Sequence, residues 1–73
     1  MVESFYLFIL SYRGGDSSDL KSQFAERAFL DHSFPKVSTS FEELSSYIET
    51  LADEQMSSQV FDELWDLYEL KYR

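Results

Sequence analysis

The chain has 73 residues, which is enough for one domain with a modest hydrophobic core. It contains no cysteine, so no disulfide stabilises it, and its seven phenylalanines, five tyrosines and one tryptophan must supply the packing. Fourteen acidic residues against six basic residues give a formal net charge of −8. This charge disfavours sequence-independent binding to nucleic acid and to anionic membrane surfaces, because both require an excess of cationic side chains.

The negative charge is concentrated in the second half of the chain. Residues 37–73 hold nine acidic and two basic residues, whereas residues 1–36 hold five acidic and four basic residues. The second half therefore suits a cationic partner, although an acidic surface also serves solubility alone.

The N-terminal sequence gives no sign of export or of membrane insertion. Met1-Val2-Glu3 contains no basic segment, and the apolar run from Phe5 to Leu10 has six residues. Such a run is too short for the core of a signal peptide or for a membrane span. Together with the absence of cysteine, this favours a cytoplasmic protein that does not associate with membranes.

The first helix is predicted over residues 5–12, with Ser4 as its N-cap and Gly14 just beyond its end. Its apolar residues exceed what one core-facing stripe requires, and Tyr6, Leu7 and Leu10 lie off the main stripe. Such a helix is either central in the fold or partly exposed for a partner. A strand is also compatible with so short a run, but no second strand is available to pair with it.

The second helix is predicted over residues 17–32, opened by Asp16 and carrying an apolar stripe. The stripe consists of Leu20, Phe24, Ala25, Ala28 and Phe29. Pro35 keeps Phe34 out of helical geometry, so the chain turns there and Phe34 is expected to anchor the turn in the core.

Two further helices are predicted over residues 40–51 and 58–71. Thr39 and Ser40 are alternative N-caps of the third helix, and Ser57 and Ser58 of the fourth, with residues 52–57 as a polar connection. The fold class is therefore all-α, a compact bundle of four helices in one domain spanning residues 1–73. The predicted core contains Phe24, Phe41, Leu44, Phe61, Leu64 and Trp65.

No pattern in the sequence indicates catalysis, a cofactor or a metal. His32 is the only histidine, and its neighbours Asp31 and Ser33 are adjacent in sequence, so they cannot form a catalytic triad with it. One histidine without cysteine does not make a usual structural zinc site. Trp65, Tyr68 and Tyr72 could stack on bases, but their spacing is typical of a core stripe and their neighbours are acids. We therefore expect no catalytic residue, cofactor-binding residue or metal ligand, and no enzyme.

Two surfaces are candidates for binding a partner. The first is the outer side of the first helix, with Tyr6, Leu7 and Leu10, and the second is the acidic side of the last helix, with Asp62, Asp66 and Glu69. An exposed apolar cluster is the more telling of the two, because acids on a helix surface are common. The competing interpretation is that the first helix is buried on all sides and that the acids only keep the domain soluble.

Several segments, in this order along nearly the whole chain, resemble the YozE family of small uncharacterised proteins from low-GC Gram-positive bacteria. The segments are Ser4-Phe5-Tyr6, Asp31-His32-Ser33-Phe34-Pro35-Lys36, Ser45-Ser46-Tyr47-Ile48-Glu49 and Phe61-Asp62-Glu63-Leu64-Trp65-Asp66-Leu67-Tyr68. The resemblance implies a bundle of the sterile-alpha-motif-like group and transfers no activity or catalytic residue. That group hosts both protein-interaction modules and helix-hairpin-helix DNA binders.

The expected function is that of a non-enzymatic protein-interaction module, which binds a protein partner not identified by the sequence or associates with itself. The alternative is a nucleic-acid-associated protein that uses the same fold as a helix-hairpin-helix. The charge favours the first, because the only glycine-rich turn, at Gly14 and Gly15, is followed by Asp16 and Asp19 rather than by lysines.

Overall fold

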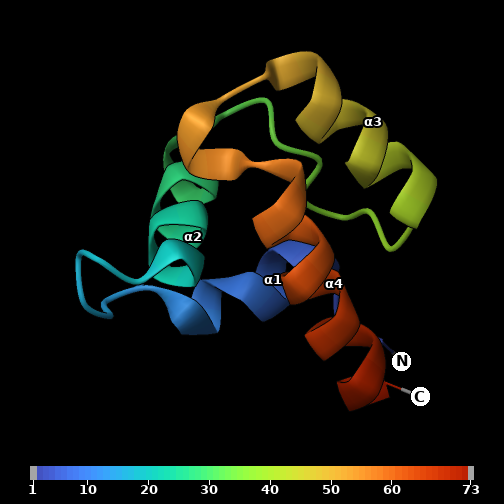
Figure 1. Ribbon diagram of the computed structural model, residues 1–73. Helices are drawn as coiled ribbons and strands as arrows, with labels where there is room; N and C mark the ends of the chain where they lie inside the picture. Colours follow the sequence, from blue (N-terminus) through green and yellow to red (C-terminus); the bar gives the residue numbers. More distant parts are fainter. Residues whose placement is uncertain (1, 73) are drawn as a thin grey trace.

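The computed structural model describes residues 2–72, and Figure 1 shows how its helices are arranged. Four α-helices and two 3₁₀ turns occur in this range, without a strand, so the all-α prediction is confirmed. The α-helices are α1 (Phe5–Ile9), α2 (Leu20–Leu30), α3 (Phe41–Leu51) and α4 (Ser58–Tyr72), and the 3₁₀ turns are η1 (Leu10–Tyr12) and η2 (Glu54–Met56). The helix α4 starts near the centre of the molecule, extends to the lower right in Figure 1 and contacts the other three α-helices.

The first helix begins where the sequence predicts, because the Ser4 hydroxyl accepts a hydrogen bond from the Leu7 N–H at 3.2 Å. It then tightens into the 3₁₀ turn η1 within the predicted range 5–12. Gly14 follows with a φ of 84°, a left-handed conformation that glycine adopts without steric cost. The chain can therefore turn back towards α2.

The second helix is shorter than the predicted range 17–32. Asp19 caps it by accepting from the Lys21 N–H at 2.9 Å, whereas Asp16 accepts from the Ser18 N–H and closes the preceding turn. Two aspartates three residues apart offer the same capping chemistry, and the backbone reaches helical geometry only after the second. At the other end, Asp31 is extended and the helix stops at Leu30.

Serine residues begin the last two helices. The Ser40 hydroxyl accepts from the Glu43 N–H at 3.2 Å, which settles the choice between Thr39 and Ser40. The Ser57 hydroxyl accepts from the Val60 N–H at 3.2 Å and so caps α4. Both are the local patterns on which the predicted boundaries were based.

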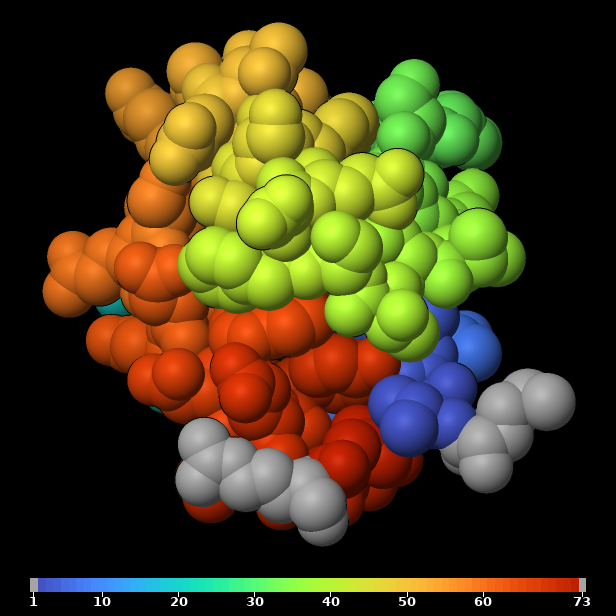
Figure 2. Space-filling view, turned by 90° about the vertical axis from the view of Figure 1, so that its right-hand side faces the viewer, coloured from blue at the N-terminus to red at the C-terminus, as the bar shows by residue number. Residues whose placement is uncertain are grey.

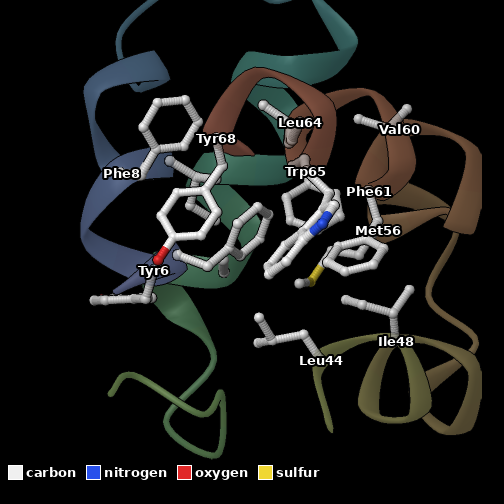
Figure 3. Close-up of a cluster of buried hydrophobic side chains, with 14 of the residues drawn as sticks. Tyr6, Phe8, Leu44, Ile48, Met56, Val60, Phe61, Leu64, Trp65 and Tyr68 are labelled. Carbon is white, nitrogen blue, oxygen red and sulfur yellow. The ribbon is translucent and has the colours of Figure 1, made fainter. Parts of the chain in front are cut away.

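The core lies between α4 and the other helices, and Figure 3 shows its side chains converging from α1, α3 and α4. Of the predicted core residues, Phe24, Leu44, Phe61, Leu64 and Trp65 are buried, and Phe34 anchors the turn after α2 as expected. Met56 is buried as well, so residues 52–57 are not only a polar connection. Residues 54–56 of this connection fold into η2, which packs against α2.

The prediction that Phe41 is buried is wrong, because 42% of this residue is exposed. Phe41 is the first residue of α3, and its ring packs on Phe61 and Trp65 at centroid distances of 5.6 and 5.4 Å while one side faces solvent. Leu20 and Phe29, expected in the apolar stripe of α2, are also exposed. The Phe29 ring is covered instead by the Arg13 guanidinium, whose carbon lies 3.6 Å from the ring centroid.

Replacing Phe61 with alanine tests the core. Phe61 is 1% exposed and contacts the rings of Phe5, Phe41 and Trp65. Phe61→Ala is expected to lower the free energy of unfolding by about 3–5 kcal/mol, because the surrounding side chains cannot close such a cavity. Chemical denaturation measures this loss, and Phe41→Ala, at a half-exposed ring, is the control with the smaller effect. A Phe61→Ala variant as stable as wild type contradicts the assignment of Phe61 to the core.

A hydrogen bond between Tyr47 and Asp31 joins α3 to the end of α2, since the Tyr47 hydroxyl donates to the Asp31 carboxylate. Burial, followed by this carboxylate, raises the pKa of Tyr47 from 10.0 to about 12. The folded state therefore holds this proton more tightly than the unfolded state. Its contribution to stability is full below pH 10 and is lost as the pH rises from about 10 to 12.

Tyr47→Phe is accordingly expected to weaken the fall in stability between pH 10 and 12, because the variant has no hydroxyl to titrate there. Denaturant unfolding of both proteins at several pH values measures the slope, and absorbance of tyrosinate identifies the group. Equal slopes for the variant and wild type would show that Tyr47 does not titrate differently in the two states.

Candidate interaction surface

The surface predicted on α1 is only partly exposed. Leu7 is 53% exposed, Leu10 is partly buried against the core, and Tyr6 is buried with its ring 5.6 Å from that of Phe34. The expectation that Tyr6 lies on the surface is wrong, because Phe34 folds back from the turn after α2 and covers it. Of the predicted apolar cluster, only Leu7 is exposed.

The acidic surface predicted on α4 is exposed throughout. We call Asp62, Asp66 and Glu69 the acidic face, since their i, i+4, i+7 spacing puts the three on one side of α4. Within residues 2–72 no basic side chain lies within 4.0 Å of their carboxylates. Four of the five basic residues in this range pair with other acids, namely Arg13 with Glu26, Lys21 with Glu63, Arg27 with Asp53 and Lys71 with Glu3.

A small hollow of about 270 Å³ adjoins the acidic face. We call it the aromatic hollow, and its lining is formed by Val2, Thr39, Trp65, Tyr68, Glu69 and Tyr72. Figure 2 looks onto this side of the molecule, with the start of α3 above α4 and the N-terminal segment beside the end of α4. Residues from three distant parts of the sequence therefore build the hollow, and Glu69 belongs both to it and to the acidic face.

Three rings from successive turns of α4 contact one another along the hollow in tilted and edge-to-face arrangements. The centroid of Trp65 lies 5.1 Å from that of Tyr68, which lies 5.2 Å from that of Tyr72. The Trp65 indole N–H donates to the Glu69 carboxylate at 2.5 Å, and the Tyr68 hydroxyl donates to the Glu3 carbonyl at 2.6 Å. The polar atoms of both buried rings thus have partners, and the ring surfaces remain to line the hollow.

A charged cluster at the end of α4 adjoins the same rings. The Lys71 ammonium lies 3.3 Å from the Glu3 carboxylate and 5.3 Å from the centroid of the Tyr72 ring. The Tyr72 hydroxyl and then Lys71 lower the pKa of Glu3, while burial and then Glu3 raise the pKa of Tyr72. Glu3 balances the charge of Lys71. Among residues 2–72, the carboxylates of Glu69, Asp66 and Asp62 therefore leave this region negatively charged.

The residues considered for chemistry do not come together. His32 is exposed in the turn after α2, and Gly14 and Gly15 lie in the exposed turn before it. Within residues 2–72 no three histidine, aspartate or glutamate side chains are grouped so that they could hold a metal ion. None of the helices in this range combines the length and the apolar character needed to cross a membrane.

Sequence reasoning assigned Trp65, Tyr68 and Tyr72 to the core and missed the hollow. Trp65 and Tyr68 are indeed buried, but Tyr72 is only half-buried. Its position in the last turn of α4 was the available signal. The contributions of Val2 and Thr39 depend on tertiary packing that periodicity does not reveal.

Comparison with known proteins identifies the family. The model of the family described as YozE SAM-like fold matches residues 4–70. The chain belongs to this family. It is 48% identical over 68 residues to the UPF0346 protein YozE of Bacillus subtilis, which covers 93% of this chain and 92% of that protein. A UPF0346 protein of Geobacillus kaustophilus is also 48% identical, and the match covers 93% of this chain and 94% of that protein. A UPF0346 protein of Lactiplantibacillus plantarum is 46% identical, and the match covers 93% of each chain.

The resemblance stated from the sequence is thereby confirmed, and with it the sterile-alpha-motif-like fold. The names of these relatives carry no activity, substrate or partner, so the family leaves the function to be argued from the surface of this chain.

Proposed function

We propose that this domain is a non-enzymatic protein-interaction module that works in the cytoplasm. The observation that carries the proposal is the acidic face of α4, whose carboxylates have no basic side chain within 4.0 Å among residues 2–72 and which adjoins the aromatic hollow with its half-buried Tyr72 ring. Accessible rings next to charges favour recognition of another protein, because the rings supply contact area and the charges supply specificity. The absence of cysteine supports a reducing compartment.

The half-exposed rings strengthen this proposal. One side of the Phe41 ring faces solvent beside Trp65. Phe41 is the first residue of α3, a position at which the helix could equally have begun with a polar residue. A 73-residue domain has little stability to spare, so apolar surface in contact with water is better covered by a partner. Leu7 on α1 offers a second, smaller apolar contact.

Affinity capture from a lysate of a related Gram-positive bacterium tests the proposal, with three baits compared by quantitative mass spectrometry. Wild type is expected to retain specific proteins. Asp62→Asn with Asp66→Asn removes two charges of the acidic face without changing its shape and is expected to lose them. Glu49→Gln with Glu54→Gln removes two exposed charges elsewhere and is the control.

Sedimentation of the same proteins separates self-association from binding to another protein. Leu7→Glu is included here, since Leu7 is the exposed residue of α1, together with Leu10→Glu at the partly buried position. A change of mass in Leu7→Glu assigns self-association to α1. The proposal fails if wild type retains no protein that the charge variant loses and sediments as a monomer at every concentration.

Nucleic-acid binding is the alternative that charge argues against. Four of the five basic residues in the described range are already paired with acids, so few are available to replace the counterions of a phosphate backbone. Fluorescence anisotropy with a labelled duplex in about 150 mM salt is expected to show no saturable binding. Sub-micromolar affinity for DNA or RNA under these conditions would make nucleic-acid association the leading function.

A further inference from the structure

We propose that the aromatic hollow is a docking site for a basic segment of a partner protein and receives one arginine or lysine side chain. This inference rests on the proposed interaction function and names the chemistry of the partner. It is carried by the combination of three adjoining aromatic rings, a carboxylate in the same lining and the negative charge of the adjoining acidic face.

The size of the hollow favours a single side chain. Its volume of about 270 Å³ lies below the range of roughly 300–1,000 Å³ typical of small-molecule pockets. A long side chain with an apolar stem and a charged head fits a lining in which ring carbons dominate and Glu69 supplies the charge. The stem would lie against Trp65 and Tyr72, and the head would reach the carboxylate.

The rings provide attraction that a carboxylate alone does not. A cation within about 6 Å of an aromatic centroid is attracted by the ring, and arginine is the residue that most often takes this position. Residues 2–72 contain four such contacts, among them Arg13 over Phe29 at 3.6 Å and Lys71 over Tyr72 at 5.3 Å. The Trp65 N–H occupies one oxygen of Glu69, which leaves the second oxygen to accept from the incoming cation.

The charge balance around the hollow also favours a cation. Among residues 2–72, Lys71 is the basic residue beside it, and its ammonium lies 3.3 Å from the Glu3 carboxylate, which balances its charge. Glu69 and, further along α4, Asp66 and Asp62 remain, so a segment lying along α4 places further basic residues next to the acidic face. Within residues 2–72, an acidic segment would meet three carboxylates and one paired lysine, and this part of the surface would repel it.

The single tryptophan makes the hollow directly observable, because Trp65 lines it and is the only indole in the chain. The titrant is an acetylated, amidated hexapeptide of alternating glycine and arginine, followed by tryptophan fluorescence at low ionic strength. Saturable change in the emission of Trp65 is expected. The same peptide with citrulline for arginine keeps size and hydrogen-bonding groups without charge, and it is expected to bind about tenfold more weakly.

Two substitutions measure separately how much the Tyr72 ring and the Glu69 carboxylate contribute to peptide binding. Glu69→Gln removes the charge at the hollow, and Tyr72→Leu removes a half-buried ring while keeping apolar bulk. Each is expected to weaken binding about fivefold. Glu49→Gln, an exposed acid on α3 outside the hollow, loses the same charge and is expected to change affinity less than twofold. Circular dichroism shows whether each variant is folded. If Tyr72→Leu is unfolded, the affinity of Glu69→Gln alone tests the inference.

The inference is overturned if the citrulline peptide or spermidine binds as tightly as the arginine peptide. It is also overturned if Glu49→Gln weakens binding as much as Glu69→Gln, or if the emission of Trp65 shows no saturable change. These results leave the proposed function standing if lysate capture still depends on Asp62 and Asp66. Conversely, specific peptide binding without any captured protein would support the hollow and contradict the broader module.

Discussion

The burial of Phe5 against α4 is the contact on which the rest of the structure depends. Its side chain is fully buried, and its ring lies 5.3 Å from Phe61, 5.6 Å from Trp65 and 5.6 Å from Tyr68. These rings come from three successive turns of α4, so one residue near the start of the chain fixes both the position and the rotation of the last helix. The Phe5 N–H also donates to the Ser38 carbonyl at 3.3 Å, which brings the segment before α3 to the same place.

Fixing the rotation of α4 determines which of its residues remain at the surface. With Phe61, Leu64 and Tyr68 turned inward, the acidic face must turn outward, and Trp65 lies at the border between the two. Ser38 brings Thr39 and Phe41 beside that border. The aromatic hollow is therefore a consequence of how Phe5 and the N-terminal segment pack.

The sequence predicted those features of the fold that depend on residues close to one another along the chain, namely the helices and their caps. The 3.6-residue spacing located all four α-helices, and hydroxyl caps at Ser4, Ser40 and Ser57 placed three starts. The boundary of α2 was misplaced, because Asp16 and Asp19 offer equivalent caps and local sequence does not rank them.

Burial was predicted less well, because it depends on what lies across the interface. Tyr6 is covered by Phe34, and Met56 lies in η2, which packs against α2, so both contacts join distant segments. Phe41 fits the apolar stripe of α3 but lies at its first turn, where α4 covers only one side of the ring. The acidic face was identified from spacing alone, whereas the hollow beside it needs Val2 and Thr39.

A surface that shares residues with the core constrains how recognition can vary in this fold. Trp65 contacts Phe5, Phe41 and Phe61, so a change at this position alters stability and the hollow together. Glu69 is exposed at the rim of the hollow, where a charged group adds little to the free energy of unfolding, and Tyr72 is only half-buried there. Partner preference can therefore change at these rim positions and along the acidic face, while Trp65 and Tyr68 remain fixed by the packing around Phe5.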